Sequence, residues 1–245
     1  MINIVIPAYQ LHDYTTLCIQ TIQRCTKVPW EIILIDNGSN PPYGQYYPDE
    51  RIQVIRNSEN LGFPKAVNQG WKASNGEAVC FLNNDIIVTP GWLERLSAHL
   101  EQVDIVGPTT NYSCGMQCIN LPTIYESQDE LDQMAGQFCQ NNEGWLKRVR
   151  WLSGFCLLVR RRVLEDVGGF NEIYGMGNYE DLDLCLTAGK LGYGIGLAYD
   201  VYVHHFGSMT HAAIRLSVQE QGCKNYPIFA ERWEDGHIQE IKEEE

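Results

Sequence analysis

Three oxygen-bearing side chains, Asn83, Asn84 and Asp85, come directly after the apolar run Ala78–Leu82. An unbroken apolar run of this length predicts a buried strand. In open α/β sheets, ligands bind beyond the carboxyl ends of the strands. A carboxylate flanked by amides at such a place suits a hard cation such as Mg²⁺ or Mn²⁺, which can bridge to a diphosphate. Asn and Asp are also common in turns, so an ordinary turn between strand and helix is the alternative interpretation.

A second acid, Asp36, ends the predicted strand Glu31–Asp36, and Ala8-Tyr9 follow the predicted strand Ile2–Pro7. In a parallel sheet these strand ends lie on the same edge as Asp85, where an acid can accept a hydrogen bond from a nucleobase or a ribose. No glycine-rich phosphate loop follows the first strand, so the fingerprint of dinucleotide-binding dehydrogenases is missing. A cation at Asp85 would replace that loop as the anchor of a diphosphate.

A run of acids, Glu180-Asp181-Leu182-Asp183, opens the predicted helix Glu180–Lys190. One interpretation is that these acids only stabilise the start of the helix, because the helix dipole favours negative charge in the first turn. The other is that one of them has a catalytic role. In a catalytic role, one carboxylate of the run could act as a general base and take a proton from a substrate. Asp183 points elsewhere on the helix than Asp181, so we expect it to be structural.

Two histidines, His204 and His205, end the predicted strand Tyr199–His205. In a regular strand their side chains point to opposite faces. If neither histidine belongs to a functional site, we expect one ring to be packed in the core and the other to be solvated. Either ring could bind a metal or a phosphate, so the pattern alone leaves open which of them faces a site.

Strands and helices alternate in the first part of the chain, which predicts a parallel sheet covered on both faces. Besides the strands already named, two further strands are predicted there, at Ile52–Arg56 and Asp104–Gly107. Three helices are predicted: Asp13–Cys25, Pro64–Ser74, and a third that ends at about Leu100. The last of these helices is expected to start at an N-cap, Thr89, with Pro90 in its first turn.

The second part of the chain has a different pattern, with an irregular stretch over 109–124. Ser127 and Glu130 have capping-box spacing and predict a helix to Cys139. The remaining predicted elements are a single strand over Arg148–Val159, a helix over Arg161–Val167, and helical stretches over 211–233 that are interrupted at Pro227.

The chain has 245 residues, a charged fraction of 20% and a formal net charge of −13. This length is sufficient for one full core, and the charged fraction is ordinary for a globular protein. No basic stripe is present, which argues against a nucleic-acid partner. An anionic substrate would need a metal or local positive groups instead.

Nine cysteines are scattered along the chain, and several lie within apolar runs. Their odd number and positions are typical of buried thiols in a reducing compartment rather than of a disulfide framework. Cys114 and Cys118 are close in sequence, but no second pair at zinc spacing accompanies them. The chain begins directly with a predicted strand, and no apolar run approaches the ~20 residues of a membrane span. We therefore expect a soluble, cytoplasmic protein without an integral membrane segment.

Eight stretches of the chain resemble the motifs of one enzyme family. They are IVIPAY, IILIDNGS, NLGFPKAVNQG, FLNNDIIVTPGWL, WLSGFCLLVRR, VGGFNE, NYEDLDLCLTAGKLGY and VHHFGS, in this order, between residue 2 and about residue 208. The chain is similar to the family-2 nucleotide-sugar glycosyltransferases of the GT-A fold, particularly to the bacterial rhamnosyltransferase-like branch.

This resemblance implies a single-domain α/β protein of the GT-A fold, with a mixed, mainly parallel sheet flanked by helices. Residues 1–208 would form the glycosyltransferase domain, with a nucleotide-sugar-binding half at 1–107 and an acceptor-binding, catalytic half at 108–208. Residues 209–245 would form a C-terminal helical extension with an acidic tail.

The resemblance also implies which residues contact the nucleotide-sugar donor. They are Pro7, Ala8, Tyr9, Asp36, Asn60, Gly62, Lys65, Asn68, Asn83 and Asn84, with the uracil or thymine base near the first four. The family's metal motif begins with an acid, which is Asn83 here. Asp85 must therefore provide most of the coordination of Mn²⁺ or Mg²⁺, and the nucleotide completes the site.

The family places its catalytic base at Asp181 and a histidine at the position of His204, where it could ligate the metal. The start of a helix is expected to lower the pKa of Asp181. Trp151, Gly154 and Glu180 are implied on the acceptor side, although Trp151 by itself is typical of a core residue.

The predicted function is an inverting transfer of a sugar from a UDP- or dTDP-sugar to a hydroxyl group, with a divalent cation. The acceptor would be a glycan, a lipid-linked glycan or a protein glycan. One alternative is a catalytically silent scaffold that binds nucleotide-sugars. The other is a sugar nucleotidyltransferase, which needs a basic, glycine-rich first loop that 8–13 does not provide.

Overall fold

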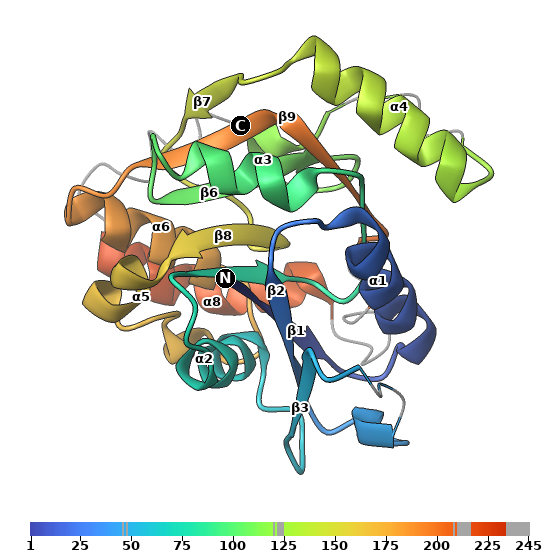
Figure 1. Cartoon of the computed structure of the whole chain (residues 1–245). Helices are drawn as coiled ribbons and strands as arrows, with labels where there is room; N and C mark the ends of the chain where they lie inside the picture. Colours follow the sequence, from blue (N-terminus) through green and yellow to red (C-terminus); the bar gives the residue numbers. More distant parts are fainter. Residues whose placement is uncertain are drawn as a thin grey trace.

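One nine-stranded sheet forms the centre of the molecule in the computed structural model (Figure 1). The structure describes residues 1–45, 47, 49–119, 121, 125–207, 209 and 217–233. The strands are β1 (Ile2–Ala8), β2 (Trp30–Asp36), β3 (Ile52–Arg56), β4 (Ala78–Leu82), β5 (Ile86–Val88), β6 (Ile105–Thr110), β7 (Leu146–Arg148), β8 (Cys156–Arg160) and β9 (Ile195–His205). Their order across the sheet is β3-β2-β1-β4-β8-β6-β9-β5, and β7 pairs with β9.

The sheet is mixed. Strands β3, β2, β1 and β4 are parallel neighbours, as the alternating pattern of the first part predicts. Strand β8 runs antiparallel between β4 and β6, and β5 and β7 run antiparallel to β9. The carboxyl ends of β1, β2 and β4 therefore lie on one edge, where the amino end of β8 joins them.

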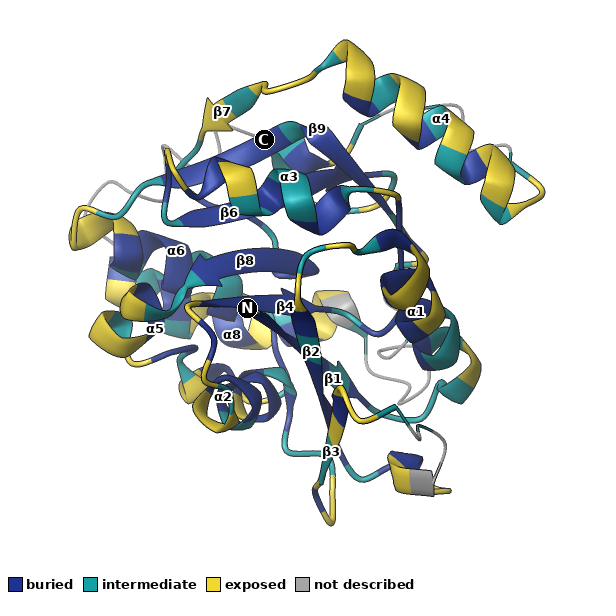
Figure 2. Ribbon diagram, in the orientation of Figure 1, coloured by how far each residue is buried: buried dark blue, intermediate teal, exposed yellow. Residues whose placement is uncertain are grey.

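Helices cover both faces of the sheet because apolar side chains of the strands alternate between the faces. Ile4 and Ile6 of β1 belong to one core cluster, whereas Val5 belongs to the other. The first cluster includes α1 (His12–Cys25) and α3 (Trp92–His99). The second includes α2 (Phe63–Ala73), α5 (Arg161–Val167), α6 (Glu180–Lys190) and α8 (Val218–Trp233). Figure 2 shows buried strands between helices whose outer sides are exposed.

The helix α4 (Gln128–Asn141) covers the end of β9 and has a small core of its own with Tyr202. Its start confirms the predicted cap, since Ser127 Oγ accepts a hydrogen bond from Glu130 N at 3.3 Å. Three short 3-10 helices complete the described elements: η1 (Tyr43–Gln45), η2 (Gly115–Gln117) and η3 (Glu172–Tyr174).

Three expected element boundaries are wrong. Thr89 does not cap α3, which begins at Trp92 after Gly91, because the Thr89 hydroxyl donates to the carbonyl oxygen of Tyr202 at 2.6 Å. The single strand expected over 148–159 is two strands, β7 and β8, joined by a loop that reaches the site described below. Pro227 does not interrupt α8, which continues through it to Trp233.

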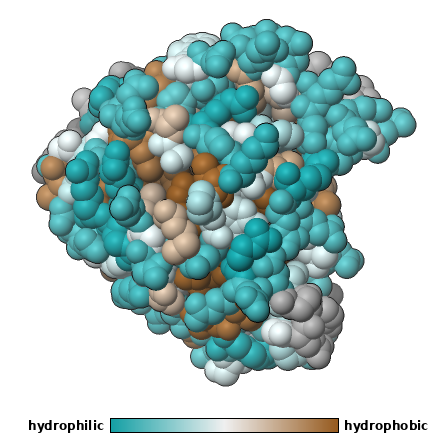
Figure 3. Space-filling view, viewed as in Figure 1, coloured by the Kyte–Doolittle hydropathy of each residue, from teal (hydrophilic) through white to brown (hydrophobic). Residues whose placement is uncertain are grey.

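The surface in the view of Figure 3 is mostly hydrophilic, with small separate apolar patches. Within the part of the chain that the structure describes, no helix is long and apolar enough to cross a membrane. All nine cysteines are free thiols, six of them buried and three exposed.

Candidate active site

A cavity of about 380 Å³ opens at the edge of the sheet where β1, β2 and β4 end. Six segments far apart in the chain line it. They are 7–9 at the end of β1, Asn37 after β2, Asn60, Gly62 and Phe63 at the start of α2, 83–85 after β4, 112–114 after β6, and 153–155 before β8. The loop 176–178, the acids Glu180 and Asp181 at the start of α6, and His205 at the end of β9 complete it. The structure thus brings together most of the residues that the sequence singled out.

The side of the cavity beside β1 and β2 is built by a network of amides. Asn60 Oδ1 accepts hydrogen bonds from Asn37 Nδ2 at 2.8 Å and from Gly62 N at 3.0 Å. Gly62 has a φ of +85°, and a Cβ atom added to it would lie 2.1 Å from the carbonyl oxygen of Gly175. Only glycine fits there, because both the backbone conformation and the close approach exclude a side chain.

Asp36 does not line this cavity, so the structure does not support its predicted contact with a nucleobase. Its Oδ1 accepts from Ser39 N at 2.9 Å, and its Oδ2 accepts from Tyr43 N at 3.1 Å and pairs with Arg56. The carboxylate is fully buried and stabilises the turn after β2. The next residue, Asn37, lines the cavity instead.

Lys65 and Asn68, both predicted to contact the donor, also lie outside the cavity. Lys65 is exposed on α2. Asn68 is buried, and its Nδ2 donates to the carbonyl oxygen of Phe170 at 2.8 Å and to Glu172 Oε1 at 2.9 Å. Its Oδ1 accepts from Phe170 N and Trp71 Nε1. The amide of Asn68 therefore joins α2 to the segment that leads to α6.

Asp85 and His205 meet at the centre of the cavity. Asp85 is 3% exposed, and its Oδ1 lies 3.3 Å from His205 Nε2. His205 Nδ1 is 2.8 Å from the carbonyl oxygen of Tyr112, which indicates that Nδ1 carries the proton in the neutral ring. Nε2 is buried and has no hydrogen-bond partner among the described residues. In that tautomer Nε2 presents a lone pair beside the Asp85 carboxylate.

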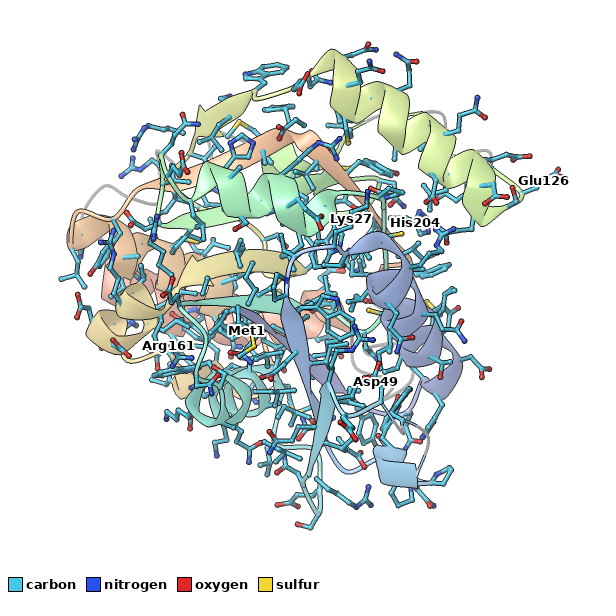
Figure 4. All side chains as sticks on the ribbon, in the orientation of Figure 1. Met1, Lys27, Asp49, Glu126, Arg161 and His204 are labelled. Atoms are coloured by element: carbon cyan, nitrogen blue, oxygen red, sulfur yellow. The ribbon has the colours of Figure 1, made fainter. Side chains whose placement is uncertain are left out.

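His204, the predicted metal ligand, does not line the cavity, because β9 alternates its side chains and His205 takes the inward position. The ring of His204 contacts Tyr125, whose hydroxyl pairs with His204 Nδ1. Desolvation lowers the pKa of His204 to about 4, so the ring is neutral at physiological pH. In Figure 4, His204 lies where β9 ends, on the opposite side of the view from Arg161 at the start of α5.

The residues present fit a divalent cation that binds together with a substrate. A carboxylate and an imidazole nitrogen that has no hydrogen-bond partner among the described residues are a suitable donor pair. Across the described ranges, no three His, Cys, Asp or Glu side chains gather as a metal site. A cation bound by Asp85 and His205 would therefore need further ligands, such as waters or phosphate oxygens. Asn83 and Asn84 also line this part of the cavity, with Asn84 Nδ2 bonded to Thr15 Oγ1 at 2.9 Å.

Glu180 and Asp181 form the acidic end of the cavity. Asp181 Oδ2 accepts from Gly154 N at 2.7 Å and its Oδ1 accepts from Leu182 N at 2.9 Å. Burial raises the pKa of Asp181, which corrects the expected lowering by the helix start, although these two N–H groups oppose the rise. Burial and the neighbouring Asp181 raise the pKa of Glu180 well above its ordinary value. Its Oε2 is buried without a partner among the described residues.

Asp183 is structural, as predicted. It is 3% exposed, and its Oδ1 accepts from Arg232 Nε at 2.8 Å and Trp233 Nε1 at 2.7 Å. Trp151 does not line the cavity; it is buried and its ring packs against Gly115. Gly154 does line it, and its position is constrained because a Cβ atom there would lie 3.1 Å from Cβ of Asp181.

Several cavity residues were not predicted. Sequence reasoning missed Tyr112, Ser113, Cys114, Phe155 and the loop 176–178. The sequence Gly175-Met176-Gly177-Asn178 did carry a signal, since two glycines and an asparagine directly before an acidic helix start are typical of a functional turn. The others lie in stretches without a distinctive pattern.

The charge of the cavity is negative. Asp85, Glu180 and Asp181 are its acids, and among its described lining residues none is Lys or Arg. An anionic ligand would therefore be repelled unless a cation accompanied it.

A mixed sheet of this order, with a cavity beyond the strand ends, defines the GT-A fold of the nucleotide-sugar transferases. Two solved structures share this fold. The structure of GalNAc-T7 with UDP, GalNAc and Mn2+ has a TM-score of 0.64 at 14% identity, and the match covers 84% of this chain. "S. aureus TarS 1-349 in complex with UDP-GlcNAc" has a TM-score of 0.59 at 17% identity and covers 83%. This chain covers 43% and 58% of those two chains.

The chain belongs to glycosyl transferase family 2, whose model matches residues 3–168. This confirms the family that the motifs predicted. Its relatives include the N-acetylglucosaminyl-diphospho-decaprenol L-rhamnosyltransferase of Mycobacterium tuberculosis, 29% identical over 71% of this chain and 65% of that protein. Glycosyltransferase AglE of Haloferax volcanii is 26% identical over 88% of this chain and 71% of that protein. The match to a protein of Sinorhizobium fredii, 26% identical over 79% of this chain, spans only 23% of that protein.

Proposed function

We propose that this protein transfers a sugar from a UDP- or dTDP-sugar to a hydroxyl group of a glycan, a lipid-linked glycan or a protein glycan. The observation that carries the proposal is that one cavity contains both the Asp85–His205 pair and the Glu180–Asp181 pair. Family membership supports glycosyl transfer. The similar structures with UDP or UDP-GlcNAc support a nucleotide-sugar donor.

The proposal includes a divalent cation, Mn²⁺ or Mg²⁺, held by Asp85 and His205. The negative cavity supports this, because the carboxylates of Asp85 and Asp181 would repel a diphosphate without compensation. The similar structures that contain Mn²⁺ support it further. When bound, the cation would neutralise the charge that develops on the diphosphate leaving group.

In the proposed reaction, Asp181 takes the proton of the acceptor hydroxyl while the hydroxyl oxygen attacks the anomeric carbon. The bond from that carbon to the diphosphate breaks on the opposite face, so the configuration inverts. The N–H groups of Gly154 and Leu182 hold the Asp181 carboxylate in place. Burial and the neighbouring Asp181 raise the pKa of Glu180, which favours its protonated form, and in that form it can donate a hydrogen bond to a sugar oxygen.

The test is donor turnover with a panel of UDP-, dTDP- and GDP-sugars, Mn²⁺ and a panel of glycan acceptors. We expect release of UDP or dTDP, loss of release with a chelator, and a product whose anomeric configuration is opposite to that of the donor. A product of retained configuration would contradict the mechanism. Tight nucleotide binding without release or transfer under any of these conditions would favour the silent scaffold.

A further inference from the structure

Asn225 lies within α8 and is 1% exposed. Its Nδ2 donates to the carbonyl oxygens of Tyr174 at 2.8 Å, Gly177 at 2.7 Å and Asn178 at 3.3 Å. A side-chain amide has two N–H groups, so the three carbonyl oxygens share them. One buried amide thus joins α8 to the short segment 174–178, which is distant in sequence.

This segment has an unusual backbone. Gly175 and Gly177 have φ values of +59° and +126°, and Asn178 and Tyr179 follow with +73° and +77°. Two consecutive non-glycine residues in this region are strained, and such a conformation persists only where the surrounding structure holds it. The segment leads directly into Glu180 and Asp181.

The segment is held between two parts of the molecule. On one side the segment contacts Gly62. A Cβ atom added to Gly62 would lie 2.1 Å from the carbonyl oxygen of Gly175, so no side chain separates the segment from the amide-lined part of the cavity. On the other side is Asn225. Gly177 and Asn178 themselves line the cavity. A shift of the segment would therefore change the cavity and the start of α6 together.

Further contacts fix α8 beyond Asn225. Asp183, on the first turn of α6, accepts hydrogen bonds from Arg232 and Trp233 at 2.8 and 2.7 Å. The ring of Tyr179 stacks on Phe229, with 4.9 Å between ring centroids. The acids Glu180 and Asp181 lie between these anchor points in the chain. The family match ends at residue 168, so α8 and the segment lie outside it.

We propose that Asn225 is a positioning residue of the active site: through the carbonyl groups of 174–178, it holds Glu180 and Asp181 in their places in the cavity. The inference rests on the proposed function, because positioning is measured by sugar transfer. It extends that function to a helix of the C-terminal part, which would otherwise be a packing element.

The test compares Asn225→Ala with two control variants on the same helix. Trp233→Phe removes a buried hydrogen bond from α8 to Asp183 and leaves the amide of Asn225 and its three carbonyl partners unchanged, and Lys224→Ala changes an exposed neighbour. Because a misplacement of about 1 Å can cost ~10²-fold in rate, we expect Asn225→Ala to lower kcat by about tenfold or more. The affinity for UDP with Mn²⁺ should change by less than about threefold, since the Asp85–His205 pair does not contact α8. Trp233→Phe should lower the melting temperature and leave kcat within about twofold.

A second variant and a second measurement keep the inference open to refutation. Asn225→Ser retains one donor and should give a kcat between those of wild type and Asn225→Ala, even if the alanine variant does not fold. Hydrogen exchange of the peptide that covers 174–181 should become faster in the variants at Asn225 and stay unchanged in Lys224→Ala. If a folded variant at Asn225 matches Trp233→Phe in both kcat and melting temperature, the positioning role is refuted. If the wild-type protein transfers no sugar at all, the proposed function is refuted, and kcat can no longer test Asn225. Hydrogen exchange still can: an unchanged rate over 174–181 in the variants at Asn225 would refute its positioning role.

Discussion

Glu180 and Asp181 are adjacent in the chain, but their carboxyl groups have different surroundings. Asp181 accepts two backbone hydrogen bonds, whereas Oε2 of Glu180 is buried without a partner among the described residues. Burial raises the pKa of both groups, and the charge of Asp181 raises that of Glu180 further. Asp181 therefore loses its proton first and is the better candidate for a general base.

Replacement of the candidate base should affect the reaction and not the donor complex. General-base catalysis contributes ~10²–10⁴-fold, so Asp181→Asn should lower turnover on about that scale. UDP affinity measured by calorimetry should remain close to that of wild type. Asp183→Asn is the control, because its carboxylate binds α8 and its loss should lower the melting temperature. Wild-type turnover in a folded Asp181→Asn protein would mean that another group, with Glu180 first, is the base.

The raised pKa of Glu180 predicts a dependence of stability on pH. The folded-state pKa lies above the ordinary value of 4.5, so the stabilising contribution of this group is complete below that value and is lost as pH rises through the folded-state pKa. Glutamine does not titrate. Glu180→Gln should therefore raise the melting temperature relative to wild type more at about pH 7 than at about pH 4. An equal difference at both pH values would show that Glu180 ionises normally.

The two neighbouring histidines allow a direct comparison of metal ligation. Loss of an outer-shell partner of a metal typically costs 10–100-fold in affinity, so loss of a ligand should cost at least about tenfold. We expect His205→Ala to weaken Mn²⁺-dependent UDP binding by this amount and His204→Ala to change it little. Titration of UDP with Mn²⁺ and with a chelator measures both. A larger loss in His204→Ala would contradict the assignment of His205.

At the scale of elements, two chain segments meet across Gly62 with no room for a side chain. Gly62→Ala should destabilise the protein by at least about 1–3 kcal/mol, because alanine would adopt a φ of +85° and overlap the Gly175 carbonyl. Gly136→Ala is the matched control, since Gly136 is inside α4 with open space around it. That change should stabilise by about 0.5–1 kcal/mol. Urea denaturation measures both, and effects of the same sign would contradict the contact at Gly62.

The mixed sheet explains how the Asp85–His205 pair comes to lie in the same cavity as Gly154, which holds Asp181. The parallel strands β1, β2 and β4 end at the side of the cavity that contains Asp85, and the antiparallel β8 brings the preceding segment 153–155 to the same edge. Strand β9 pairs with β5, with His205 opposite Ile86, which places its ring beside Asp85. Each functional group thus comes from the end of a strand or the start of a helix.

At the scale of the whole molecule, the exposed cysteines report on occupation of the cavity. Cys114, Cys118 and Cys223 are exposed, and only Cys114 of these lines the cavity. These three thiols should react with a thiol reagent in the native protein, and the six buried ones only after unfolding. UDP with Mn²⁺ should slow the labelling of Cys114 and leave Cys223, the internal control, unchanged. Mass spectrometry of the labelled peptides measures each site, and equal protection of both would indicate a global effect instead of binding in the cavity.

The local pattern of the sequence was sufficient for the first part of the fold and for the centre of the site. Apolar runs that end in polar residues predicted β1, β2 and β4, and with them the position of Asp85 at a strand end. These features depend on residues close together in the chain. The motifs also identified the family correctly, since they are short stretches that need no knowledge of their partners in space.

The partners of single side chains were decided only by tertiary structure. Asp36 and Asn68 are residue types that often bind ligands. In the structure, however, Asp36 pairs with Arg56, and Asn68 donates hydrogen bonds to the 170–172 segment. Alternation in β9 predicted opposite faces for His204 and His205, yet only the pairing with β5 shows which face is the cavity. Similarly, the start of a helix would lower the pKa of Asp181, but burial by distant segments raises it. In each case the deciding interaction joins residues far apart in sequence, and its energy depends on the desolvation and packing that folding creates.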